Sequence, residues 1–234
     1  MSEIFCDKSS CSNCTFRKFS FFNELTDEEL IMINKNRTTR FIKSGEKIFS
    51  ENEIATSLIS LKVGKAKISK NGIQDAILYF NQSVDFLGLE SLIVGTPYPF
   101  TATAIENTEI CLIPRKDFLE LLQTNPDFSM KIIKLLANIS KIANDRLLML
   151  TQKHIRGRLA HSLLQLRELH GVLKDKKTLN IQLKRSDLAA YANMNPSNAI
   201  RVLSQFVSEK LIETDKRKIK IINLKGLIRI SDLG

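Results

Sequence analysis

Residues 186–222 have the sequence SDLAAYANMNPSNAIRVLSQFVSEKLIETDKRKIKII, and this stretch decides the fold. Residues 186–192 predict a short helix, and residues 193–194 predict a turn. A second helix is predicted over residues 195–209, with Asn195 as its N-cap. Two short helices joined by a tight turn form a helix-turn-helix unit.

The predicted second helix has an apolar face and a polar face. The apolar face carries Ala199, Val202, Leu203 and Phe206, and the polar face carries Ser197, Asn198, Arg201 and Gln205. We expect the polar face to enter the major groove of DNA. There Arg201 can bind a guanine edge through two hydrogen bonds, and Asn198 can pair similarly with adenine. For such a helix taken alone, a merely solvated polar face is the alternative.

A β-hairpin with a basic tip is predicted directly after this helix. Residues 211–214 and 219–222 have the pattern of two strands, and residues 215–218 form the turn between them. Helix, turn, helix and hairpin in this order predict a winged helix-turn-helix that binds double-stranded DNA. The candidate DNA contacts are Arg185, Asn195, Ser197, Asn198, Arg201, Gln205, Lys216 and Lys218.

The excess positive charge of the chain lies in its C-terminal third. Residues 151–234 hold 17 Lys and Arg against 7 Asp and Glu, whereas residues 1–150 hold 18 of each kind. The formal net charge of +10 therefore comes from the region that contains the predicted DNA-binding unit. A basic segment attracts polyanions through its field and by releasing counterions from phosphates, although charge alone also fits a membrane surface or a solvated face.

Short stretches rich in β-branched residues occupy the chain from residue 39 to about residue 114. Gly and Pro turn signals separate these stretches, so we expect a sandwich or jelly-roll barrel. Ahead of this region, Thr26 and Glu29 predict a capping box at the start of a short helix.

A long amphipathic helix is predicted after Pro126. Its apolar positions recur at steps of three and four residues, and they are Leu136, Ile139, Ala143, Leu147 and Leu150. An apolar stripe of this length, with the small Ala143 in its middle, fits a partner helix across a two-fold axis. Packing on the protein's own core explains it equally well.

Several classes of protein are not expected from this sequence. No apolar run approaches the roughly 18 residues of a membrane helix, and the first residues lack the pattern of a secretion signal, so we expect a cytoplasmic protein without a membrane partner. His154, His161 and His170 lie along helical sequence with no nucleophile or carboxylate arrangement beside them. We therefore do not expect an enzyme. A protein scaffold is the other alternative, and it would differ from a regulator in lacking sequence-specific binding to DNA.

Five motifs along the chain carry a resemblance to a known family. They are Ser44-Gly45-Glu46, Asp85-Phe86-Leu87-Gly88-Leu89-Glu90, Ala104-Ile105-Glu106 with Ile110-Cys111-Leu112-Ile113-Pro114, Arg156-Gly157-Arg158-Leu159-Ala160, and Arg185-Ser186-Asp187-Leu188-Ala189. With them the chain resembles the CRP/FNR family of bacterial regulators, and most of all the FNR-like oxygen and redox sensors. The resemblance implies a homodimer that binds a palindromic operator and contacts RNA polymerase.

The implied fold is α+β, with an N-terminal cyclic-nucleotide-binding-like β jelly-roll barrel, a long dimerisation helix and a C-terminal winged helix-turn-helix. We expect a Cys-rich segment over 1–22 and a β-roll sensor domain over 23–125. The dimerisation helix is expected over 126–150, and the DNA-binding domain over 151–234.

The chain departs from the family pattern at two sites. The recognition helix of the FNR-like subgroup carries a Glu, a Ser and an Arg. Here Arg201 matches the Arg, whereas Ser197 and Ile200 stand at the other two positions. In the cyclic-AMP-binding branch an Arg and a Glu hold the phosphate and ribose, but here Phe100 and Leu89 occupy their places. We do not expect cyclic AMP as a ligand, because a buried phosphate needs its cation.

Four cysteines form the candidate metal site: Cys6, Cys11, Cys14 and Cys111. The resemblance implies a [4Fe–4S] cluster, since Cys11 and Cys14 match a Cys-x-x-Cys of the subgroup and Cys111 stands at its remote ligand position. Ser20 stands where a third N-terminal ligand belongs, so Cys6 would replace it. Zinc and four unliganded thiols are alternatives, as is a small effector such as nitric oxide or an organic ligand in the barrel.

Overall fold

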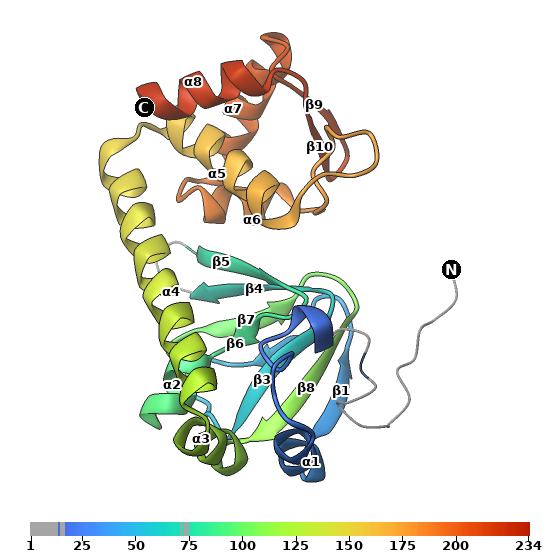
Figure 1. Cartoon of the computed structure of the whole chain (residues 1–234). Helices are drawn as coiled ribbons and strands as arrows, with labels where there is room; N and C mark the ends of the chain where they lie inside the picture. The colour runs from blue at the N-terminus through green and yellow to red at the C-terminus, as the bar shows by residue number, and fades with distance from the viewer. Residues whose placement is uncertain (1–13, 15–16, 71, 73–74) are drawn as a thin grey trace. The chain divides into compact units, whose positions relative to one another are not determined.

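The computed structural model describes residues 14, 17–70, 72 and 75–234. The chain forms two compact units, of which the first holds residues up to Ser69 together with Phe80–Ile139, and the second holds Lys70–Tyr79 together with Ser140–Gly234. Helix α4 (Pro126–Gln152) has residues in both. The predicted order of a β-rich part, a long helix and a winged helix-turn-helix is confirmed (Figure 1).

Two four-stranded sheets form the β-rich part. Their strand orders are β1-β8-β3-β6 and β2-β7-β4-β5. The strands are β1 (Thr38–Ile42), β2 (Lys47–Phe49), β3 (Ser57–Val63), β4 (Lys65–Lys70), β5 (Ala76–Gln82), β6 (Phe86–Leu87), β7 (Thr101–Ala104) and β8 (Thr108–Pro114). These strands lie within residues 38–114, the region in which the sequence predicted short strands.

The longest run of buried strand residues lies in β3, which pairs antiparallel with β8. Leu58 and Leu61 are fully buried there, and Lys62 is buried beside them with 6% of its side chain exposed. The Lys62 ammonium forms a 2.6 Å ion pair with Glu109 of β8. Because an unpaired charge in this position would cost several kcal/mol, the pair allows a lysine inside the sheet.

Short helices flank the sheets. They are a 3₁₀ turn (Arg17–Phe19), α1 (Asp27–Lys35), α2 (Leu89–Val94) and α3 (Arg115–Thr124). The capping box at α1 is confirmed: the Thr26 hydroxyl accepts from the Glu29 amide, and the Glu29 carboxylate accepts from the Thr26 amide at 2.8 Å.

The first turns of α4 are packed against the β-rich part by aromatic side chains. Phe128 is 2% exposed, and its ring lies 6.0 Å from that of Phe22 in a stacked arrangement. The ring of Phe118, from α3, meets Phe128 edge-on at 6.2 Å. These contacts fix the beginning of the long helix in the first unit.

The second unit contains the winged helix-turn-helix. Its elements are α5 (Ile155–His170), α6 (Arg185–Tyr191), α7 (Pro196–Ser208), β9 (Ile212–Asp215), β10 (Lys218–Ile221) and α8 (Leu224–Leu233). The sequence pattern did not predict α8, which packs along α5 where Gly157 leaves room for the backbone of Gly234. None of the helices in the described part of the chain is long and apolar enough to cross a membrane.

Gly88 allows an aromatic side chain to fill the region between β6 and α2. Gly88 has φ +64°, and a Cβ atom added there would lie 2.3 Å from the ring of Tyr98. Tyr98 is 4% exposed and stacks on Phe49 with ring centres 3.8 Å apart. Glycine is therefore required at this position by both its backbone conformation and the close ring.

We predict that Gly88→Ala destabilises the protein more than Gly45→Ala. Gly45 also has a positive φ, +89°, but a Cβ there would meet nothing within 4 Å. The control should lose about 1–2 kcal/mol from backbone conformation alone, and Gly88→Ala about 1–3 kcal/mol more from overpacking. Urea unfolding measures both, and equal losses would contradict the proposed packing against Tyr98.

Candidate nucleic-acid interface

The turn between α6 and α7 is held by a helix cap and a buried side chain. Asn193 has a left-handed φ of 50°, which reverses the chain after α6. Met194 follows with 4% exposure and packs inside the unit. The Asn195 side chain then accepts from the amide of Asn198 at 2.8 Å, which confirms Asn195 as the N-cap of α7.

The predicted apolar face of α7 is buried. Its residues are between 0 and 4% exposed, and they are Ala199, Val202, Leu203 and Phe206. On the opposite face, Ser197 and Arg201 are exposed, and Asn198 is half-buried. Arg201 donates to the side-chain oxygen of Asn198 at 3.3 Å, so the two predicted base contacts lie next to one another.

A hydrophobic residue on the outer face of α7 differs from the expected polar pattern. Ile200 is 52% exposed and lies beside Arg201. Val207, two turns further along, is 40% exposed. The resemblance places Ile200 at a position where the FNR-like subgroup carries Ser. The structure shows that this apolar residue is exposed on the surface of the helix.

Arg156 of α5 braces the C-terminal half of α7. Its guanidinium lies over the ring of Phe206, 5.1 Å from the centroid, and forms an ion pair with Glu209. The same guanidinium lies 3.5 Å from the side-chain oxygen of Gln205. Gln205, a predicted DNA contact, is thus half-buried and turned toward α5.

The wing is a tight hairpin. Asp215 of β9 pairs with Lys218 of β10, so only Lys216 and Arg217 form the loop, two residues fewer than predicted. Lys216 takes a left-handed φ of 48°. The side chains of Lys216, Arg217 and Lys218 are all exposed, which leaves three positive charges at the tip.

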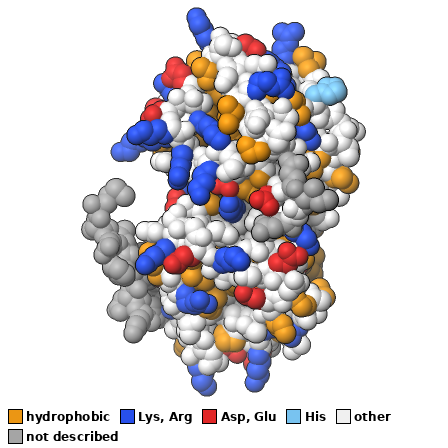
Figure 2. Space-filling view, turned by 180° about the vertical axis from the view of Figure 1, so that it is seen from behind, with side chains coloured by type: hydrophobic (Ala, Val, Ile, Leu, Met, Phe, Trp, Pro, Cys, Tyr) orange, Lys and Arg blue, Asp and Glu red, His pale blue; other side chains and the backbone are white. Residues whose placement is uncertain are grey.

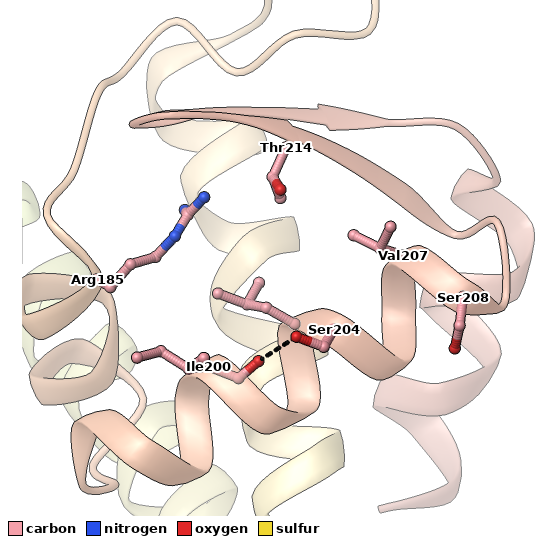
Figure 3. A pocket seen from close by; sticks show the side chains of 7 residues that line it. Arg185, Ile200, Ser204, Val207, Ser208 and Thr214 are labelled. Atoms are coloured by element: carbon pink, nitrogen blue, oxygen red, sulfur yellow. Dashed lines mark hydrogen bonds between the residues drawn. The ribbon is translucent and has the colours of Figure 1, made fainter.

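Arg185 lies under the wing instead of facing outward. Its Nη2 donates to the backbone oxygen of Lys216 at 2.9 Å, and its Nη1 is buried with no hydrogen-bond partner in the described part of the chain. The side chain lines a groove of about 420 Å³ between α7 and β9 (Figure 3). Ile200 and Thr214 line the same groove from α7 and β9.

Positive side chains gather on the unit that carries this interface. Figure 2 shows blue Lys and Arg side chains crowding the winged unit, whereas blue and red side chains alternate over the β-rich unit. The distribution agrees with the charge count along the sequence, in which residues 151–234 carry the whole excess. An exposed recognition helix with a basic wing on a basic unit is the arrangement that binds a phosphate backbone.

Two family models match this chain. The model of the cyclic nucleotide-binding domain matches residues 39–125, and the model of the Crp-like helix-turn-helix domain matches residues 157–230. The chain belongs to the CRP/FNR family. It is therefore a DNA-binding transcription regulator, and the predicted fold class is confirmed.

Relatives in this family resemble the chain over most of its length. The fumarate and nitrate reduction regulatory protein of Vibrio cholerae is 23% identical over 96% of this chain and 91% of that protein. The anaerobic regulatory protein of Aggregatibacter actinomycetemcomitans is 24% identical over 94% of this chain and 87% of that one. The structure of FixK2 from Bradyrhizobium japonicum has a TM-score of 0.75 and 23% identity, over 83% of this chain and 96% of that one.

In the part that corresponds to the nucleotide site of the CRP/FNR family, apolar side chains replace the polar ones. Leu89 is 2% exposed and Phe100 is half-buried. Thr101, the residue that still matches a phosphate contact, accepts from the amide of Glu51 at 3.1 Å. This hydroxyl accepts in that hydrogen bond and keeps its own proton for donation, so the absence of cyclic AMP stays a prediction from the sequence.

The candidate cysteine site of this CRP/FNR protein is only partly described. Cys6 and Cys11 lie outside the described residues. Cys14 and Cys111 are free and half-buried, and the described residues contain no group of three or more side chains suited to a metal.

A cation lies against the Cys111 thiol. Arg37 donates from Nη1 to the sulfur of Cys111 at 3.4 Å, a contact that the sequence did not indicate. Burial raises the pKa of Cys111, and the positive charges of Arg37 and Lys62 partly offset this rise. The charge of Cys14 adds a small further rise to the pKa of Cys111.

The predicted dimerisation stripe on α4 is partly exposed. Ala143 and Leu147 are exposed, whereas Leu136, Ile139 and Leu150 are half-buried. Four further apolar side chains on this helix, which the sequence reasoning did not single out, are about half exposed: Met130, Ile133, Ile142 and Leu148. The exposed surface of α4 therefore includes only part of the set of residues predicted to form the dimer contact.

We predict that Arg185→Ala loosens the wing. Loss of the hydrogen bond to the Lys216 carbonyl removes about 1 kcal/mol, so hydrogen exchange of the β9 and β10 amides should be about fivefold faster. Lys216→Ala is the matched control, because it removes a positive charge at the tip but keeps the accepting carbonyl. Unchanged exchange in Arg185→Ala would contradict the link between α6 and the wing.

Proposed function

We propose that this protein is a homodimeric, sequence-specific transcription regulator gated by oxygen or redox state through a cysteine-ligated iron–sulfur cluster. The observation that carries the DNA-binding part is the exposed face of α7, where Arg201 and Asn198 lie together on a helix whose other face is buried. We propose that it acts in the cytoplasm and contacts RNA polymerase there. The domain limits predicted from the sequence remain part of this proposal.

The proposed DNA contacts fall into two groups. Arg201, Asn198 and Ser197 would face base edges from the first turns of α7, the part of a recognition helix that reaches into the major groove. Lys216 and Lys218 would contact phosphates from the wing, which fixes the position of the protein without reading sequence.

Three other candidate DNA contacts have structural roles that modify the proposal. Arg185 links α6 to the wing, Asn195 uses its side-chain oxygen as a cap, and Gln205 faces Arg156. The Asn195 side chain keeps its N–H donors, so we propose that it contacts a phosphate at the edge of the interface. The Nη1 of Arg185 is buried and its Nη2 binds the wing, so we propose that Arg185 acts on DNA by positioning the wing. Gln205 would contribute least to base recognition.

The proposed dimer forms along α4. Leu147 is 60% exposed and Ile133 is 56% exposed, and both lie on the side of the helix that includes Ala143. Large exposed apolar side chains that recur along one helix indicate a partner helix, since water would otherwise cover them. A second copy of the chain would cover this stripe and place two recognition helices on one palindromic operator.

The residues present agree with a thiolate-ligated cluster as far as they are described. Cys111 interacts electrostatically with Cys14, and Arg37 donates to the Cys111 sulfur, which lowers the pKa of this thiol against the larger rise caused by burial. When bound, a [4Fe–4S] cluster supplies an oxygen-labile link between its ligands. The names of two relatives, a fumarate and nitrate reduction regulator and an anaerobic regulator, support this reading.

Ser20 favours a second candidate function, a CRP/FNR regulator without a cluster. Its hydroxyl donates to the backbone oxygen of Arg17 at 2.9 Å and accepts from the amide of Phe22 at 3.3 Å. Ser20 is thus occupied by the backbone at the position where the subgroup carries a ligand. In this alternative the signal is thiol or zinc chemistry at Cys14 and Cys111, or a small effector in the barrel.

We predict that Arg201→Ala weakens binding to the preferred DNA sequence by about tenfold to a hundredfold, because a base contact is lost. Binding to unrelated DNA should fall much less. Lys218→Ala is the comparison: it should weaken binding to both DNAs by the same factor and lower the salt slope by about one. Fluorescence anisotropy at several salt concentrations measures these effects, and an Arg201→Ala variant with unchanged preference would contradict the proposal.

We predict that protein purified without oxygen is brown, holds about four iron atoms per chain and bleaches in air. Cys111→Ala should lose the iron and the visible absorption. Ser20→Ala, which changes a residue held by the backbone, should keep both. Colourless wild-type protein, or a Cys111→Ala variant with the wild-type spectrum, would contradict the cluster and leave the alternative without one.

A further inference from the structure

The first turns of α7 carry one large apolar side chain among the polar residues of the outer face. Ile200 is 52% exposed, and it lies directly beside Arg201. Ser197 and Ser204 stand three and four residues away from it, and both are exposed. Residues at these spacings lie on the same side of the helix as Ile200. Arg201 is turned by about 100° around the helix axis from Ile200, so the two side chains lie on adjacent sides of α7.

Two of the polar side chains near Ile200 are turned away from it. The Ser204 hydroxyl donates to the backbone oxygen of Ile200 at 3.0 Å, so it is turned back onto the helix (Figure 3). The Arg201 guanidinium points toward Asn198, which lies on the side of the helix away from Ile200. The Ile200 side chain is therefore available for contact with a partner that binds the outer face of α7.

DNA offers one kind of apolar group to such a side chain. In the major groove the four bases present hydrogen-bond donors and acceptors, and only thymine adds a methyl group at C5. A polar base edge placed against Ile200 would lose its water without gaining a hydrogen bond, which disfavours it. A thymine methyl placed there would bury apolar surface on both sides.

We propose that Ile200 is a specificity-determining residue that packs against the C5 methyl group of a thymine in each operator half-site. This proposal rests on the proposed function, because it requires α7 to enter the major groove. It adds one base to the recognition pattern, next to the base that Arg201 contacts.

Val207 provides a matched control on the same helix. It is also apolar, 40% exposed and part of the wall of the same groove. It lies seven residues further along α7, away from the N-terminal turns that reach the bases. If exposed apolar surface on α7 acted in a general way, both residues would affect DNA binding equally.

The experiment begins with selection of the preferred operator from a random DNA library by the wild-type protein. Each thymine of the half-site is then replaced in turn by deoxyuridine, which removes the methyl group and leaves base pairing intact. For wild type, one replacement should weaken binding about fourfold, the value of one buried methyl group. The same replacement should have no effect on Ile200→Ala, whereas Val207→Ala should keep the fourfold loss.

Further variants and outcomes separate this inference from the proposed function. Ile200→Val keeps a branched apolar side chain and should retain preference for the methyl group. Because Ile200 is half-exposed, the variants should fold, and circular dichroism confirms this. Two results would overturn the role of Ile200 and leave the proposed function standing. In the first, no replacement of thymine by deoxyuridine weakens binding of the wild-type protein. In the second, Ile200→Ala still binds the thymine operator more tightly than the deoxyuridine operator. Failure to select any preferred sequence would contradict the proposed function.

Discussion

Burial of one face of α7 is the interaction on which the DNA interface depends. Val202, Leu203 and Phe206 are no more than 4% exposed, and each such side chain contributes on the order of 1.5–3 kcal/mol when it leaves water. This packing also fixes the rotation of the helix about its axis. Because successive residues are about 100° apart on a helix, a shift of one residue would turn Arg201 away from the front. The cap at Asn195 and the brace from Arg156 hold the two ends of the same helix.

Local signals in the sequence predicted the elements that depend on neighbouring residues. The N-cap at Asn195, the capping box at Thr26 and the alternation of buried positions in α7 all involve residues within a few positions of one another. Strands in the β-rich part were recognisable for the same reason, since β-branched residues favour a pleated, half-buried surface. The family resemblance then supplied the order of the parts.

The contacts that the sequence could not predict join residues far apart in the chain. Arg37 and Cys111 are separated by 74 positions, and Arg185 reaches a carbonyl 31 positions away. Arg156 contacts Glu209 and Phe206 across about fifty positions. A side chain with charge and length can serve a ligand, a partner or the protein's own backbone, and only tertiary packing decides among these. For that reason Arg185 was placed among the DNA contacts, although its guanidinium is turned toward the wing.

The central claim is that two copies of α7 recognise one DNA site with two-fold symmetry. Hydroxyl-radical footprinting of the purified protein on its selected operator tests it most directly. The account predicts an inverted repeat with two protected half-sites whose centres lie about one helical turn, 10–10.5 base pairs, or a multiple of it apart. Protection of a single half-site, or uniform protection along the DNA without a preferred sequence, would contradict this claim.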